Sequence, residues 1–207
     1  MTAYRAVVFD IGGVVTGSPL HAIADYEREL GLPRNAVNRV VVGAGASGAW
    51  ATLERGELML EDFYARFEAD CTAAGATIDA RELMRRVGEI ARPRPAMLDA
   101  ITRLRAAGIK AAALTNNWKS EEEGTRALQP WFDVFVESAV VGLRKPDPRI
   151  YQLVCRELGV APVEAVFLDD IGGNLKAARE LGMTTIKVDE PDTALHELEG
   201  VLGIALR

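Results

Sequence analysis

Short apolar runs recur along the chain and predict five β-strands, at residues 4–10, 109–115, 132–138, 164–170 and 184–188. In most of these runs the central apolar residues are consecutive, rather than alternating with polar ones. Unbroken apolar runs of this length are typical of strands that are covered on both faces, as in a parallel sheet.

The segments between the later strands have the periodicity of amphipathic helices. In residues 148–158, Asp147 is a suitable N-cap, Pro148 occupies the first helical position, and Gly159 ends the pattern. The alternation of strands and helices predicts an α/β fold with a doubly wound parallel sheet. The apolar stripe of this helix comprises Ile150, Leu153, Val154 and Leu158.

Residues 16–90 interrupt the alternation, because they contain helical patterns and no convincing strand. Phe63, Phe67 and Cys71 are spaced one helical turn apart, which favours a core stripe over a ligand site. We therefore predict a helical subdomain inserted into a core made of residues 1–15 and 91–207. The helical patterns lie at residues 21–31, 33–41, 60–75 and 79–90.

Composition and charge limit the possible functions. The 207 residues are 49% hydrophobic and 26% charged, and the net charge of −6 gives no sign of a nucleic-acid partner. The N-terminus has no signal-peptide pattern, and no apolar run is long enough to span a bilayer. The two cysteines, Cys71 and Cys155, fit buried free thiols. We expect a cytoplasmic protein without membrane contact, and a homodimer remains open.

Polar residues stand at the predicted ends of several strands. Asp10 ends the first strand, the "TNN" motif of residues 115–117 ends the second, and Asp169 with Asp170 ends the fourth. Lys145 lies in the loop "GLRKPDP" between the third and fourth strands. Each feature alone is compatible with a structural role. Because ligands bind beyond the carboxyl ends of parallel strands, the four together predict an active site there.

These motifs resemble those of the haloacid dehalogenase (HAD)-like hydrolases. The resemblance runs through "FDIGGVV", "ALTNNW", "FDVFVESAVVGLRKPDPRIY" and "VFLDDIGGNLKAARELGM". It is strongest to the branch with the N-terminal phosphatase domain of soluble epoxide hydrolase and the hydrolase-like domain of acyl-CoA dehydrogenase fusion proteins. The resemblance implies a Rossmann-like HAD core and a helical cap formed by residues 16–90.

The resemblance also implies a magnesium site. Asp10, the backbone carbonyl of Gly12 and Asp170 would bind Mg²⁺, which prefers oxygen ligands. Asp169 would not bind the ion itself but would orient the ligands or Lys145.

The resemblance further implies the residues that handle phosphate. Asp10 would be the nucleophile that forms an aspartyl-phosphate intermediate, and Lys145 would act beside it as a catalytic point charge. Thr115, Asn116 and Asn117 would bind the substrate, with the Thr115 hydroxyl on a phosphoryl oxygen.

Gly12 departs from the pattern of the family. Most phosphatases of this family have a second Asp at this position, and it protonates the leaving oxygen and then activates water. Without it, the proton could come from Asn117 through a water, or from the insertion through His21 or Glu54; alternatively the protein hydrolyses poorly and binds a phosphate ligand.

The sequence therefore favours a Mg²⁺-dependent phosphatase acting on a small phosphorylated metabolite. One alternative is a dehalogenase, in which Asp10 attacks carbon. The other is a weakly active or non-catalytic phosphate-ligand-binding domain, which Gly12 suggests.

Overall fold

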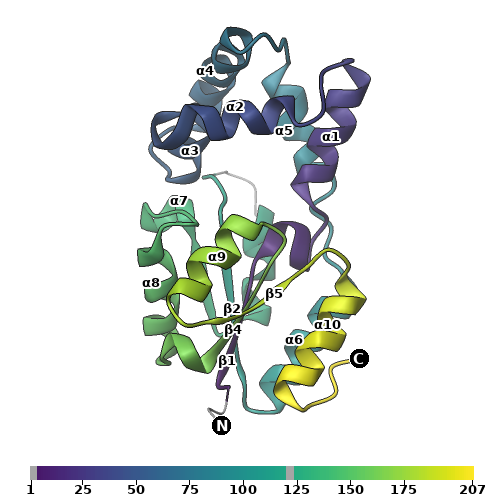
Figure 1. Cartoon of the computed structure of the whole chain (residues 1–207), viewed down its shortest axis with the longest axis vertical. Coiled ribbons are helices and arrows are strands. Elements are labelled where there is room, and N and C mark those ends of the chain that lie inside the picture. Colours follow the sequence, from purple (N-terminus) through teal and green to yellow (C-terminus); the bar gives the residue numbers. More distant parts are fainter. Residues whose placement is uncertain (1–3, 120–123) are drawn as a thin grey trace.

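The computed structural model describes residues 4–119 and 124–207, and its centre is a parallel five-stranded sheet (Figure 1). The strand order is β3-β2-β1-β4-β5, so β1 lies in the middle. The predicted α/β class and all five predicted strands are confirmed, each strand being slightly shorter than predicted. The strands are β1 Ala6–Phe9, β2 Lys110–Thr115, β3 Val134–Glu137, β4 Ala165–Asp169 and β5 Thr184–Lys187.

Helices cover both faces of the sheet. Val7 and Phe9 pack toward α6 and α10, whereas Ala6 and Val8 pack toward α8 and α9, because successive side chains of a strand point to opposite faces. This double coverage explains the unbroken apolar runs. One face carries α6 Pro95–Ala106, α10 Pro191–Leu202 and the 3-10 helix η3 Gly124–Trp131, and the other carries α8 Pro148–Leu158, α9 Gly172–Glu180 and nearby short helices α7 Ser138–Val141 and η4 Pro162–Glu164.

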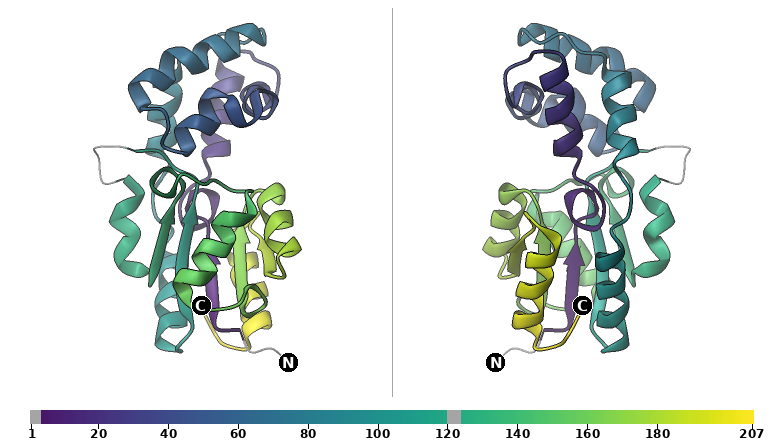
Figure 2. Two further views of the ribbon diagram at one scale, coloured as in Figure 1. Left: turned by 90° about the vertical axis from the view of Figure 1, so that its left-hand side faces the viewer. Right: turned by 90° about the vertical axis from the view of Figure 1, so that its right-hand side faces the viewer.

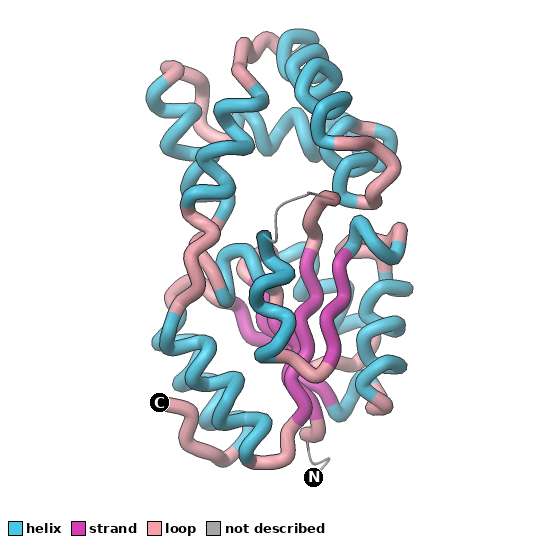
Figure 3. The backbone as a smooth tube through the Cα atoms, turned by 180° about the vertical axis from the view of Figure 1, so that it is seen from behind, coloured by secondary structure: helices cyan, strands magenta, loops and turns pink. Residues whose placement is uncertain are grey.

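The segment between β1 and β2 forms a separate group of helices, which we call the helical insertion. Figure 3 shows that it contains helices and loops, while every strand lies in the other half of the molecule. Its interior is apolar and includes the predicted stripe, with the rings of Phe63 and Phe67 stacked at 5.0 Å and Cys71 fully buried. Its helices are α1 Pro19–Glu29, α2 Ala36–Ala44, η2 Gly45–Ser47, α3 Ala49–Glu54, α4 Leu60–Ala73 and α5 Ala80–Glu89.

The insertion stands on the carboxyl ends of the strands, as both views in Figure 2 show. Its two connections to the core lie side by side, because Thr16 and Pro93 form an antiparallel bridge. The Arg94 guanidinium donates to the carbonyls of Gly13 (2.9 Å) and Val14 (3.1 Å). Entry to and exit from the insertion are therefore fixed beside the end of β1.

The two cysteines are free and buried, as predicted. Burial raises the pKa of the Cys71 thiol to about 12 and that of Cys155 to about 11, so neither provides a reactive thiolate at neutral pH. In the described residues, no helix combines the length and the apolar character needed to cross a membrane.

Candidate active site

The structure brings three carboxylates together at the tips of neighbouring strands. Asp10 directly follows β1, Asp169 ends β4, and Phe9 pairs with Leu168 across these strands. Asp170 comes next in the chain, and one oxygen from each of the three carboxylates lies within 4.8 Å of the others. The parallel pairing of β1 and β4 thus creates the cluster.

Lys145 lies inside this cluster. Its Nζ atom is 2.8 Å from Asp10 Oδ2 and 2.8 Å from Asp169 Oδ2, and the side chain is only 1% exposed. Asn116, at the end of β2, fixes the backbone beside it: Asn116 Oδ1 accepts from Lys145 N (2.9 Å), and Asn116 Nδ2 donates to Lys145 O (3.1 Å). The lysine is therefore positioned from both its side chain and its backbone.

The adjacent carboxylates Asp169 and Asp170 have different surroundings. Asp169 is fully buried and accepts hydrogen bonds from Lys145, from Ile171 N (2.7 Å) and from Asn174 Nδ2 (3.1 Å to each oxygen). Asp170 is half-buried and accepts from Ser18 Oγ (2.9 Å). Asp169 is thus occupied by protein donors on both oxygens, while Asp170 has oxygen capacity to offer a ligand.

Two of these partners, Asn174 and Ser18, were not predicted from the sequence. Asn174 follows the "LDD" motif by four residues, and this short separation could have indicated a contact with Asp169. Ser18 reaches Asp170 only because the chain folds back after β1, which no local pattern indicates.

The site carries excess negative charge. Burial raises the pKa of Asp10 well above its ordinary value, and the charges of Asp169 and Asp170 add to this effect, while Lys145 opposes it. Burial and Asp169 likewise raise the pKa of Asp170. Burial alone would lower the pKa of Lys145, but the charges and hydrogen bonds of Asp10 and Asp169 outweigh it and raise that pKa. A cation would relieve this excess charge.

The donor set and the backbone fit a small hard cation. Carboxylate oxygens and a nearby carbonyl are the ligands that Mg²⁺ prefers. The loop after β1 also leaves room for the Asp170 carboxylate, because a Cβ atom at Gly13 would lie 2.0 Å from Asp170 Oδ2.

Gly12 lies in the loop that follows β1, close to the start of α1. Its backbone angles, φ −66° and ψ 124°, are ordinary for any residue. A Cβ atom there would lie 3.1 Å from Cδ and 3.2 Å from Cγ of Pro19, the first residue of α1. The backbone conformation at position 12 therefore does not require glycine.

The remaining predicted residues divide into two groups. Thr115 is buried at the end of β2, beside Asn116. Asn117 instead turns toward β3: its Nδ2 donates to Glu137 Oε1 (2.5 Å) and its backbone N to Ser138 Oγ (2.9 Å). Its Oδ1 is buried and has no hydrogen-bond partner in the part of the chain that the structure describes. His21 is exposed on α1.

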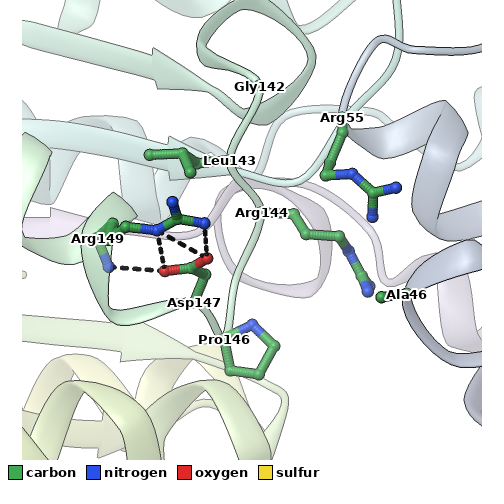
Figure 4. Close-up of a pocket in the computed structure, with 8 residues that line it drawn as sticks. All are labelled: Ala46, Arg55, Gly142, Leu143, Arg144, Pro146, Asp147 and Arg149. Atoms are coloured by element: carbon green, nitrogen blue, oxygen red, sulfur yellow. Dashed lines mark hydrogen bonds and ion pairs between the residues drawn. The ribbon is translucent and has the colours of Figure 1, made fainter.

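A crevice of about 340 Å³ lies between the helical insertion and the core. Figure 4 shows Arg55 and Arg144 near Ala46, and the ion pair of Arg149 with Asp147 on the other side of the same loop. This loop also contains Lys145, so the crevice adjoins the site. It is lined by Ala46, Arg55, Gly142, Leu143, Arg144, Pro146, Asp147 and Arg149.

The structure thus combines a Rossmann-like sheet, an Asp–Lys–Asp cluster at the strand ends, and a helical insertion above this cluster. These features together fit one class of hydrolase. The chain belongs to the haloacid dehalogenase-like hydrolases, since the model of that family matches residues 4–182. The resemblance inferred from the motifs is confirmed.

Curated relatives of this chain include parts of larger proteins. The chain is 39% identical to mouse (Mus musculus) acyl-CoA dehydrogenase family member 10, over 99% of this chain and 20% of the relative. It is 38% identical to pig (Sus scrofa) bifunctional epoxide hydrolase 2, over 99% of this chain and 40% of the relative. The chain therefore spans well under half of either protein. Phosphatase MT3486 of Mycobacterium tuberculosis is 31% identical, over 89% of this chain and 87% of the relative.

Solved structures share the fold. A HAD-like family hydrolase from Porphyromonas gingivalis matches with a TM-score of 0.70 and 22% identity, over 98% of this chain and 99% of the other. A HAD family enzyme from Bacteroides thetaiotaomicron, in complex with magnesium and inorganic phosphate, matches with a TM-score of 0.62 and 19% identity, over 89% of this chain and 94% of the other.

Proposed function

We propose that this chain is a Mg²⁺-dependent phosphatase that hydrolyses small phosphorylated metabolites through an aspartyl-phosphate on Asp10. The observation that supports this most directly is the contact of Lys145 Nζ with Asp10 Oδ2 at 2.8 Å, inside a cluster of three carboxylates. The name of the mycobacterial relative includes phosphatase, and the Bacteroides neighbour binds magnesium and phosphate, which supports the same assignment.

Asp10, the backbone carbonyl of Gly12 and Asp170 would hold the Mg²⁺ ion. When bound, Mg²⁺ offsets the negative charge of the phosphoryl oxygens and of the clustered carboxylates. Asp169 would contribute by fixing Lys145 rather than by binding the ion, because both its oxygens already accept hydrogen bonds.

Asp10 would attack the phosphorus of the ester. Its Oδ1 accepts a hydrogen bond from Ile11 N at 2.6 Å, which fixes the orientation of the carboxylate. Lys145 and the Thr115 hydroxyl would stabilise the negative charge that grows on the phosphoryl oxygens, and the backbone N–H of Asn116 would assist. Water would then attack the phosphorus of the aspartyl-phosphate and regenerate Asp10.

The helical insertion, as residues 16–90, would serve as a cap on the core of residues 1–15 and 91–207. It stands over the strand ends where Asp10 lies, so it can exclude water and select the substrate. The crevice that adjoins Lys145 supports this division of labour, because residues of both parts line it.

The proposed role of Asp170 favours phosphoryl transfer over dehalogenation, and turnover distinguishes an enzyme from a binding domain. A dehalogenase needs Asp10 to attack carbon, and that reaction has no use for Asp170 as an oxygen donor. A non-catalytic binding domain would still bind phosphate and Mg²⁺ but would not turn over.

Incubation of the purified protein with an aryl phosphate tests the proposal. We expect phosphate release that requires Mg²⁺, stops with EDTA, and is lost in Asp10→Asn. Phosphate binding without release would instead support the binding domain, and halide release from a haloacid would support the dehalogenase.

A further inference from the structure

The proposed reaction needs a proton donor that position 12 does not provide. When the phosphorus–oxygen ester bond breaks, an alkoxide leaving group must take up a proton, and Gly12 has no side chain to give one. A carboxyl group that faces the same space from another element would solve this problem.

Glu54 is such a group. It is the last residue of α3 in the helical insertion, and it is only 8% exposed because it faces the core. Its Oε2 accepts from Arg144 Nε (2.5 Å) and from Asn116 Nδ2 (3.4 Å), and its Oε1 accepts from Trp50 Nε1 (3.0 Å). The carboxylate is therefore buried at the boundary between insertion and core.

A series of contacts connects Glu54 to the proposed reacting groups, beginning with its hydrogen bond from Asn116. Asn116 follows β2, the direct neighbour of β1, and the same Asn116 side chain binds the backbone of Lys145. Lys145 in turn contacts Asp10. Glu54 thus lies on the insertion side of the tip of β2, the neighbour of β1, and the leaving group of a phosphate bound at Asp10 would extend toward the insertion.

We propose that Glu54 is the catalytic acid–base residue that replaces the missing carboxylate of position 12. This inference rests on the proposed phosphatase function. In the first step an oxygen of Asp10 bonds to phosphorus, the ester bond breaks, and its electron pair takes the proton of the Glu54 carboxyl. In the second step water attacks the phosphorus, gives its proton to the Glu54 carboxylate, and frees Asp10 and phosphate.

The surroundings of Glu54 suit both steps. Burial raises the pKa of Glu54 above its ordinary value, while Arg144, the Trp50 N–H and the more distant Lys145 oppose the rise. The charge of Arg55, the next residue, also acts on Glu54. An arriving phosphate brings negative charge that favours the protonated form. Burial raises the pKa of this acid toward the working pH, and nearby cations limit the rise. An acid with such a pKa can both give and take a proton.

Leaving-group dependence in Glu54→Gln tests the proposal. An aryl phosphate has a good leaving group and needs little protonation, whereas an alkyl phosphate needs the acid. We expect Glu54→Gln to lower kcat on an alkyl phosphate by roughly 10²–10⁴-fold and to change kcat on an aryl phosphate far less. Glu54→Asp should recover part of the alkyl activity.

Two control variants separate catalysis from structure. Glu57→Gln removes a nearby carboxylate that pairs with Arg55, and it should leave the alkyl-to-aryl ratio unchanged. Arg144→Gln removes the same contact between insertion and core but keeps the Glu54 carboxyl. Because Arg144 lowers the pKa of Glu54, this variant should keep the alkyl-to-aryl ratio and shift the alkaline loss of alkyl activity to higher pH. Thermal melts verify folding of every variant.

Each other outcome contradicts the inference. Equal losses on both esters in Glu54→Gln and Arg144→Gln would show that Glu54 only joins the insertion to the core. Aryl turnover without any alkyl turnover in the unaltered protein would show that no acid operates, while the phosphatase proposal would stand. Absence of turnover on both esters would overturn the phosphatase proposal itself.

Discussion

The carboxylate of Asp170 occupies the space where a side chain at Gly13 would begin. A Cβ atom on Gly13 would lie 2.0 Å from Oδ2 and 2.5 Å from Cγ of Asp170. Gly13 also has φ +82°, which side chains rarely adopt. Asp170 can therefore occupy its position only because residue 13 has no side chain.

Gly13→Ala should weaken Mg²⁺ binding, because the added methyl group displaces Asp170. Loss of the groups that orient a metal ligand typically weakens metal affinity by roughly 10–100-fold. By calorimetric titration, we expect Gly13→Ala to weaken Mg²⁺ affinity by at least about 10-fold. Gly75→Ala is a matched control, since Gly75 has φ +81° and a Cβ atom there would meet nothing within 4 Å. Equal Mg²⁺ affinity in the two variants would contradict the role of Gly13.

Asp170→Ala should weaken Mg²⁺ binding more than Asp169→Ala does. Asp170 offers a carboxylate with few protein donors, while Asp169 already accepts from Lys145, Ile171 and Asn174. Asp169→Ala should instead lower kcat at saturating Mg²⁺, because Lys145 loses one of its two carboxylate partners. Titration of both variants measures the order, and the reverse order would exchange the assigned roles.

Asp10→Asn should abolish turnover and stabilise the metal-free protein. Burial raises the pKa of Asp10, so the folded chain binds a proton more tightly than the unfolded chain does. Stability is therefore lost as pH rises from the ordinary carboxyl range through the raised pKa, and the amide avoids this loss.

Thermal melts in EDTA across this pH window measure the effect. The Tm difference between Asp10→Asn and the unaltered protein should grow with pH, by about 2–4 °C for each kcal/mol. Glu197→Gln, at an exposed position of α10, is the control for loss of a charge. A Tm difference that does not change with pH would show that Asp10 is not destabilised by its surroundings.

Bulky substitutions in residues 43–50 of the insertion should change substrate preference. Ala46 lines the crevice and is exposed, so Ala46→Phe should obstruct large leaving groups and scarcely affect a small aryl phosphate. We expect kcat/KM for large esters to fall roughly 10-fold. Ala74→Phe, exposed at the end of α4, is the control. Equal losses on all esters would mean that the segment supports the catalytic geometry instead.

Gly12→Asp should restore alkyl phosphate turnover to Glu54→Gln. The backbone at position 12 accepts a side chain, and Pro19 needs to shift only slightly, since a Cβ atom would lie 3.1 Å from its ring. We expect most of the roughly 10²–10⁴-fold loss to be recovered, whereas Gly12→Asp alone should gain little. A large gain from Gly12→Asp alone would show that Glu54 does not supply the proton.

The sequence predicted the sheet and the grouping of Asp10, Lys145, Asp169 and Asp170 because parallel strands bring their carboxyl ends to one edge. The strands and the polar residues at their ends can be recognised from short stretches of sequence, and the parallel order of the sheet then groups them. The helix α3 was not predicted, since it has only 6 residues and follows the segment "GAGASG".

The contact of Glu54 with Arg144 depends on how the insertion packs on the core, 90 residues away in the chain. No periodicity or motif spacing encodes such a contact. The direction of Asn117 toward β3 has the same cause, since its partners are Glu137, the last residue of β3, and Ser138, the first residue of α7.

The bridge between Thr16 and Pro93 makes the whole helical insertion topologically equivalent to a long hairpin loop. Its two ends meet at one point, and Arg94 N donates to Val15 O at 2.8 Å just below it. A short turn would be enough to join these two ends, and a longer loop adds little to the entropic cost of joining them. A segment of different length could therefore join the same two positions without any change in the strand order of the sheet.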